Sequence, residues 1–181
     1  MIHGDLKGVR FRAPVTILPT NALPNKANVL IDQNGHARLA DFGLLTIVSD
    51  PASFAASNAS AVGGTTRWMS PELLDPDQYG PESGRPTKES DCYALGMVIY
   101  EVLSGQVPFE TFMVVVVIQK VTRGEHMARP DGERGEWFTD DLWGTMKMCW
   151  ATKPESRPCI ETVLERLDQV SKSWKSLRPG G

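Results

Sequence analysis

Two aspartates and a lysine lie near the start of the chain, and residues of these types can bind phosphate groups or the metal ions that accompany them. Asp5 precedes Lys7 by two residues. Asp41 ends a short apolar run and is followed by Phe42 and Gly43, where a glycine lets the backbone turn sharply into a cleft. Two acids and an asparagine could hold Mg²⁺ on a phosphorylated substrate, because Mg²⁺ prefers a few oxygen ligands together with phosphate oxygens. The alternative is ordinary turn chemistry, which also favours aspartate and asparagine.

A hairpin is expected to carry one of these acids. The runs 29–32 and 37–41 are short and apolar, and the Asn34-Gly35 pair between them is a strong hairpin signal. Two stretches without strand or helix periodicity are expected to be loops, 44–67 and 75–88.

The rest of the chain predicts helices. The stretch 91–104 indicates a buried helix that Ser90 or Asp91 caps and a glycine follows. Residues 139–150 have an N-cap threonine, two acids in the first turn and helical spacing of apolar residues. The last helix follows Pro158. Its apolar stripe is Ile160, Val163, Leu164, Leu167, Val170 and Trp174.

One apolar segment is ambiguous. The valine run 114–117 favours a strand by propensity, whereas the length of its segment allows a helix. The order of elements is therefore a hairpin, a long loop and then helices. This order predicts a mainly α fold with a small β-hairpin.

The composition is that of an ordinary globular domain. Hydrophobic residues make up 41% of the 181 residues, charged residues 23%, and the net charge is −3, so neither nucleic acid nor an anionic membrane is expected as a partner. The longest apolar run, 112–118, is too short to span a bilayer, and no signal peptide is apparent. Cys92, Cys149 and Cys159 have no metal-ligand spacing and are interpreted as core residues of a reduced compartment. We expect a soluble, cytoplasmic protein.

Five motifs occur in a fixed order over nearly the whole chain. They are HGDLKG with AN (3–8 and 27–28), DFG (41–43), GTTRWMSPE (64–72), SDCYALG (90–96) and CW…RP (149–158). Each resembles a landmark of the protein kinase catalytic domain: the catalytic loop, the metal-binding DFG, the substrate-docking segment, the central buried helix and the closing arginine motif. The resemblance implies the C-terminal, helical lobe of a protein-kinase-like fold, and with it a helix rather than a strand at the valine run 114–117. The sequences of the third and fifth motifs are most similar to those of the tyrosine-kinase-like group, and we expect a kinase of the fungal type.

The resemblance implies catalytic roles at five positions, with ATP and Mg²⁺ as cofactors and a protein as substrate. Asp5 would accept the proton of the acceptor hydroxyl, and Lys7 would neutralise charge on the γ-phosphate. Asn28 and Asp41 would hold Mg²⁺ against the phosphates. Thr65 would help to place the acceptor residue. Lys7 and Thr65 together favour serine or threonine over tyrosine as the acceptor.

The resemblance implies structural roles at four more positions. Glu72 and Arg157 would form a buried ion pair that fixes the docking segment to the helical core. Asp91 would cap the backbone of the catalytic loop. His3 is expected to pack and donate hydrogen bonds rather than act as an acid or base.

An insertion separates two of the catalytic positions. Asn28 follows Asp5 by 23 residues here, whereas the family places the matching residues five apart. Deleting 9–26 restores an uninterrupted motif, and we interpret the segment as a retained intron. Its eighteen codons keep the reading frame, the codon of Val9 begins with GT and that of Lys26 can end in AG. The alternative is a genuine surface loop.

Two further departures bear on activity. Gly4 stands where the family has an arginine that pairs with a phosphorylated loop residue, so little dependence on loop phosphorylation is expected. No Gly-rich loop or strand lysine precedes the first motif, and we therefore expect a fragment that lacks the N-terminal lobe and is inactive by itself.

These expectations define the domain and three functions. Residues 1–175 would be the C-lobe, with the activation and docking segment at 44–72 and a disordered tail at 176–181. The first function is transfer of the ATP γ-phosphate to a protein serine or threonine. The alternatives are a non-catalytic kinase-like interaction module and a truncated product without a function of its own.

Overall fold

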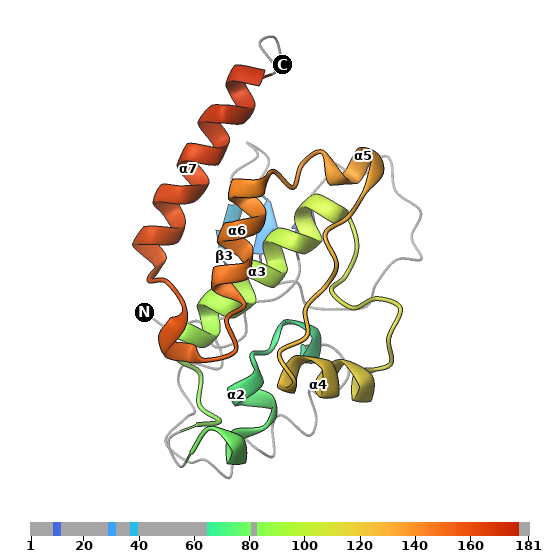
Figure 1. The fold of residues 1–181 in the computed structure, drawn as a ribbon, viewed down its shortest axis with the longest axis vertical. Coiled ribbons are helices and arrows are strands. Elements are labelled where there is room, and N and C mark those ends of the chain that lie inside the picture. Colours follow the sequence, from blue (N-terminus) through green and yellow to red (C-terminus); the bar gives the residue numbers. More distant parts are fainter. Residues whose placement is uncertain (1–8, 12–28, 32–36, 40–64, 81–82, 178–181) are drawn as a thin grey trace.

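The computed structural model describes residues 9–11, 29–31, 37–39, 65–80 and 83–177, arranged as Figure 1 shows. The predicted class, mainly α with a small β-hairpin, is confirmed. The strands are β1 (Val9–Phe11), β2 (Val29–Ile31) and β3 (Ala37–Leu39). The helices are α2 (Pro71–Leu74), α3 (Lys88–Ser104), α4 (Val114–Thr122), α5 (Gly132–Gly135), α6 (Asp140–Cys149) and α7 (Ile160–Leu177). Single 3₁₀ turns are η2 (Thr66–Trp68), η3 (Pro76–Gln78) and η4 (Pro154–Ser156).

The strands form one sheet in the order β1-β2-β3. β2 and β3 pair antiparallel, with Val29 opposite Leu39, which is the pairing that the hairpin signal predicts. β1 was not predicted, and it pairs parallel to β2 with Val9 opposite Val29. Three residues are too few to show strand periodicity in a sequence. The segment 9–26 is therefore not loop throughout, since its first three residues extend the sheet.

The central helix α3 starts from a reciprocal cap. The Ser90 N–H donates to the Thr87 hydroxyl at 3.1 Å, and the Thr87 N–H donates to the Ser90 hydroxyl at 2.8 Å. This arrangement satisfies two backbone donors that a helix start leaves unpaired. The prediction that Ser90 or Asp91 caps the helix is wrong, because Thr87 is the cap and Ser90 its partner within the first turn. Gly105 ends the helix in the left-handed region, with φ 67°.

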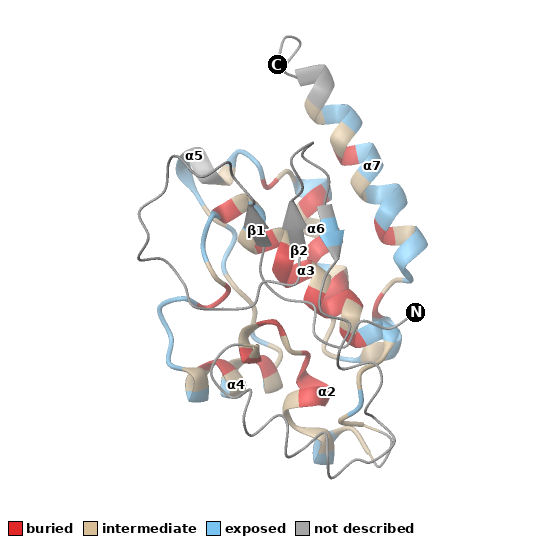
Figure 2. Cartoon of the chain, turned by 180° about the vertical axis from the view of Figure 1, so that it is seen from behind, coloured by how far each residue is buried: buried red, intermediate tan, exposed pale blue. Residues whose placement is uncertain are grey.

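The core lies between α3 and α6, where the buried positions of Figure 2 gather. α6 starts as predicted, since the Leu142 N–H donates to the hydroxyl of Thr139. Trp150 follows α6 and is fully buried. Its ring centroid lies 6.3 Å from that of Tyr100 and 5.6 Å from that of Trp143. Such tilted and edge-on aromatic pairs add to the burial of their area.

The valine run is helical, as the resemblance implies and against its strand propensity. Val117 and Val121, one turn apart in α4, are 0% and 1% exposed. Both belong to the hydrophobic core, and α4 itself contacts α2 and η2. Burial of a helical face thus overrides the preference of β-branched residues for strands.

The stripe predicted for α7 is wrong at two positions. Val163 and Val170 are buried, and Leu167 and Trp174 pack against the core, but Ile160 and Leu164 are 47% and 57% exposed. The helix meets α6 along one side, so only a narrow strip of it is covered. α7 also continues to Leu177, which makes two residues of the expected tail helical. In the described part of the chain, no helix is both long and apolar enough to cross a membrane.

Two of the three cysteines are core residues as predicted. Cys92 of α3 and Cys149 of α6 are buried together beside Val163. A hydrogen bond with Cys92, together with burial, raises the pKa of the Cys149 thiol. The core prediction for Cys159 is wrong, because this residue is exposed just before α7.

His126 gives the domain a predicted dependence on pH. Its ring stacks on Trp150, with centroids 5.7 Å apart. Burial lowers its pKa below the usual 6.5. The buried Nδ1 has no hydrogen-bond partner among the described residues. Between the folded-state pKa and about pH 6.5, the unfolded chain therefore binds more protons than the folded one. We expect the free energy of unfolding to fall as the pH decreases from 6.5 towards the folded-state pKa.

Urea denaturation at pH 7.5 and 5.5 measures this loss. His126→Phe keeps an aromatic ring but cannot be protonated, so its stability should fall less between the two values. An equal fall in both proteins would contradict the assignment to His126.

Candidate functional site

Four of the predicted site residues lie in the described part of the chain. They are Thr65, Glu72, Asp91 and Arg157. The other five predicted residues lie outside the described residues, and their roles stay predictions. They are His3, Asp5, Lys7, Asn28 and Asp41.

Two residues of the predicted metal site adjoin the hairpin strands in the sequence. Val29 is opposite Leu39, so the chain enters β2 and leaves β3 at the same end. Asn28 is the residue before Val29, and Asp41 follows Leu39 by two positions. Both donors offer oxygen atoms, which suit Mg²⁺. Among the residues that the structure describes, no cluster of three acidic, histidine or cysteine side chains could hold a metal ion.

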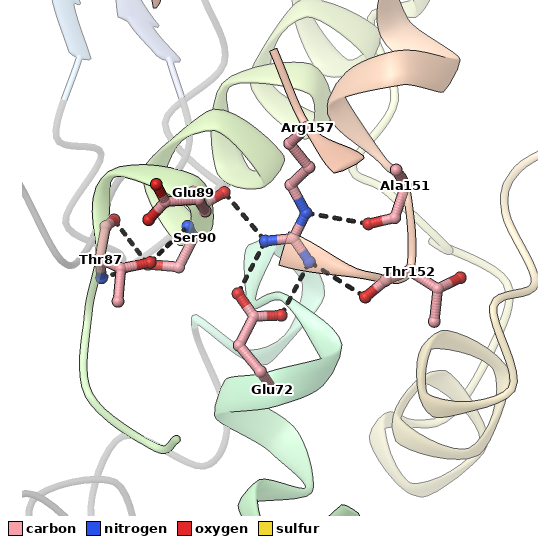
Figure 3. A network of polar contacts seen from close by, with 7 residues as sticks. All are labelled: Glu72, Thr87, Glu89, Ser90, Ala151, Thr152 and Arg157. Atoms are coloured by element: carbon pink, nitrogen blue, oxygen red, sulfur yellow. Dashed lines mark hydrogen bonds and ion pairs between the residues drawn. The ribbon is translucent and has the colours of Figure 1, made fainter. Parts of the chain in front are cut away.

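The expected ion pair between Glu72 and Arg157 is present and buried (Figure 3). Two nitrogens of the guanidinium donate to the two carboxylate oxygens of Glu72, each at 2.7 Å. The remaining three N–H groups donate to backbone carbonyls of Glu89, Ala151 and Thr152, at 2.9, 2.9 and 3.4 Å. All five donors of an arginine are therefore used.

This pair joins three distant parts of the chain. Glu72 lies in α2, Glu89 starts α3 and Arg157 follows η4. The guanidinium carbon also lies 5.1 Å from the ring centroid of Tyr93, within range of a cation–π contact. A bidentate, fully hydrogen-bonded pair of this kind compensates for the desolvation of both charges. It fixes the position of α2 against the core.

We use the name docking segment for residues 65–72, which lead into and include the start of α2. Thr65 lies directly before η2, and Met69 is extended after it. The indole N–H of Trp68 donates to a carboxylate oxygen of Glu101 in α3, at 3.0 Å. The docking segment is therefore held at Trp68, in its middle, as well as at Glu72.

Sequence reasoning missed Arg67, which lies in the docking segment and bonds the loop between α3 and α4. The motif RWMSPE identifies the segment, but no spacing rule connects Arg67 with the carbonyl of Pro108, which lies 41 residues later in that loop. Asp91 lies half-buried in the first turn of α3, and its N–H donates to the Thr87 carbonyl at 3.1 Å. Its predicted role as a cap of the catalytic loop concerns residues outside the described part.

Known proteins resemble this chain over most of its length. It is 31% identical to the receptor-interacting serine/threonine-protein kinase 3 of Rattus norvegicus, over 80% of the chain and 30% of the relative. It is 29% identical to the Dictyostelium discoideum protein named "Probable serine/threonine-protein kinase drkD", over 82% of the chain and 10% of the relative. It is 27% identical to the ankyrin repeat and protein kinase domain-containing protein 1 of Mus musculus, over 82% of the chain and 20% of the relative.

The chain thus spans less than a third of the length of each of these relatives. A family model described as protein tyrosine and serine/threonine kinase matches residues 25–167. Its match begins near the end of the segment 9–26 and contains Asn28 and Asp41, whereas Asp5 and Lys7 lie before it. The chain belongs to the family of protein tyrosine and serine/threonine kinases.

Proposed function

We propose that this chain is part of a protein kinase that transfers the γ-phosphate of ATP to a serine or threonine hydroxyl of a protein. The observation that carries the proposal is the register of the hairpin. It pairs Val29, which follows Asn28 in the sequence, with Leu39, which lies two positions before Asp41. Members of this family generally use ATP and Mg²⁺. Because the chain spans only part of its relatives, the activity belongs to the whole protein.

The proposed reaction assigns one task to each residue. The acceptor oxygen bonds to the γ-phosphorus while the bond from that phosphorus to the bridging oxygen of ADP breaks. Asp5 accepts the hydroxyl proton, and Lys7 neutralises charge on the transferred group. Asn28 and Asp41 would hold Mg²⁺, which would offset the charge of the phosphates. Thr65 helps to place the acceptor.

Two observations support a serine or threonine acceptor. Lys7 and Thr65 are the types that the resemblance associates with it, and two of the relatives named above carry serine/threonine-protein kinase in their names.

Membership of the tyrosine-kinase-like group, a fungal origin and a cytoplasmic location are also part of the proposal. The three free thiols support a reducing compartment.

The second candidate is a kinase-like interaction module without catalysis. The observation that favours it is the insertion, since the family match begins at residue 25 and leaves the catalytic-loop motif before it. Asp5 and Asn28 must meet the same phosphates in a defined geometry, and a long connection between them loosens that geometry.

Phosphoryl transfer by the whole protein tests the first proposal. We expect radiolabel from γ-labelled ATP to appear in casein as phosphoserine or phosphothreonine. Asp5→Asn should lower kcat by roughly 10²–10⁴-fold, because it removes the general base. Asp168→Asn, an exposed change on α7, is the control and should leave kcat unchanged. Phosphotyrosine, or full activity of Asp5→Asn, would contradict the proposal.

The transcript tests the interpretation of the insertion. Sequencing of the mature messenger RNA should show codon 8 joined to codon 27 if residues 9–26 are a retained intron. A transcript that contains these codons would contradict the intron and favour the interaction module.

A further inference from the structure

The side chain of Arg67 crosses from the docking segment to the loop between α3 and α4. Its guanidinium donates hydrogen bonds to the carbonyls of Pro108 at 3.2 Å, of Phe109, and of Phe112 at 2.8 Å. Hydrogen bonds from a charged donor are stronger than those between neutral groups. One side chain therefore fastens two segments that are 41 to 45 residues apart in the sequence.

The accepting loop has an unusual backbone at Phe109. With φ 54°, it is the one non-glycine residue with a positive φ in the described part of the chain. This conformation is unfavourable for a bulky residue and persists when the surroundings hold it. The ring of Phe109 is buried, and its carbonyl accepts a second hydrogen bond from the Phe112 N–H at 2.9 Å. The turn at Phe109 brings the three carbonyls to one guanidinium.

A second contact holds the neighbouring residue. The Trp68 indole donates to Glu101 of α3, and Trp68 is 7% exposed. Arg67 and Trp68 are consecutive, so two adjacent side chains fix the docking segment to different parts of the lobe. Thr65 lies two residues before Arg67, and its carbonyl accepts a hydrogen bond from the Trp68 N–H at 3.0 Å.

We propose that Arg67 is a positioning residue that holds the docking segment in the shape that receives the protein acceptor. The proposal rests on the function proposed above. Arg67 acts through the backbone of the segment, because its nitrogens are directed at the carbonyls of Pro108, Phe109 and Phe112. Lysine cannot replace it, since one ammonium lacks the planar fork that reaches three carbonyls.

Hydrogen exchange measured by mass spectrometry on the whole 181-residue chain tests the contact itself. In Arg67→Lys and Arg67→Ala, amides of 65–74 and 107–113 should exchange roughly tenfold faster or more. Amides of α6 and α7 should keep their rates. Arg166→Lys and Arg166→Ala, on the exposed side of α7, are the matched controls and should change neither region. Unchanged exchange in 65–74, or an equal increase in α3, α6 and α7, would overturn the proposal.

Steady-state kinetics of the whole kinase test the positioning role. With casein as acceptor, Arg67→Lys should raise the KM for casein roughly tenfold while the KM for ATP stays constant. A loss of kcat with both KM values unchanged would overturn the role. If the unaltered protein transfers no phosphate, the proposed function fails and the positioning role fails with it. The exchange experiment would still decide whether Arg67 holds the segment.

Discussion

Replacement of Arg157 by alanine should lower the free energy of unfolding by about 3–5 kcal/mol. The side chains of Arg157 and Glu72 are 0% and 5% exposed. Removal of one partner leaves the other charge buried without compensation, which costs more than the pair contributes. Three backbone carbonyls also lose their donor. Denaturation with urea, followed by circular dichroism, measures the loss.

Two further variants separate the stranded charge from a general packing defect. The double variant Arg157→Met/Glu72→Leu leaves no charge unpaired. It should therefore be more stable than Arg157→Met alone or Glu72→Leu alone. Lys172→Ala breaks the exposed pair with Asp168 on α7, and it should cost less than about 1 kcal/mol. A double variant less stable than both single variants would contradict this account.

Replacement of Gly96 by alanine should destabilise the domain by about 1–3 kcal/mol, because it overpacks a filled core. A Cβ at this position of α3 would lie 2.6 Å from Nε1 and 2.9 Å from Cδ1 of Trp150, and 3.0 Å from Cβ of Cys149. Trp150 and Cys149 are both fully buried and cannot move into solvent. One methyl group therefore requires a shift of α3 against α6.

The same substitution at Gly144 is the control. This glycine lies inside α6, and a Cβ there would have no atom within 4 Å. Alanine is favoured over glycine in a helix by about 0.8–1.0 kcal/mol, so Gly144→Ala should stabilise the domain. Thermal or urea denaturation of both variants should give shifts of opposite sign. A stabilising Gly96→Ala would contradict the packing described here.

Local signals in the sequence were sufficient to predict most helices and the pairing of β2 with β3. Asn34-Gly35 predicts the β2–β3 pairing because the turn sets the register of its strands. The helix at 114–122 was predictable only from the family resemblance, since its valines favour a strand when taken alone. The pair of Glu72 and Arg157 also came from the resemblance, because the two residues are 85 positions apart.

The errors arise where tertiary contacts decide between similar candidates. Thr87 and Ser90 are both good caps, and only the backbone shows that Thr87 lies outside the helix and Ser90 within it. The apolar residues Ile160 and Leu164 fit the period of α7 but lie beside the strip that α6 covers. The contacts of Arg67 depend on a turn at Phe109 that no local pattern indicates.

The five hydrogen bonds of Arg157 have a consequence for the lifetime of the folded lobe. They need α2, the start of α3 and the loop after α6 in place at once. Contacts across 85 residues carry a large loop-closure entropy and are expected to form after the folding transition state. Interactions that are absent from the transition state affect mainly the rate of unfolding. Arg157 would then determine the unfolding rate of the lobe, and so the lifetime of its folded state, more than its folding rate.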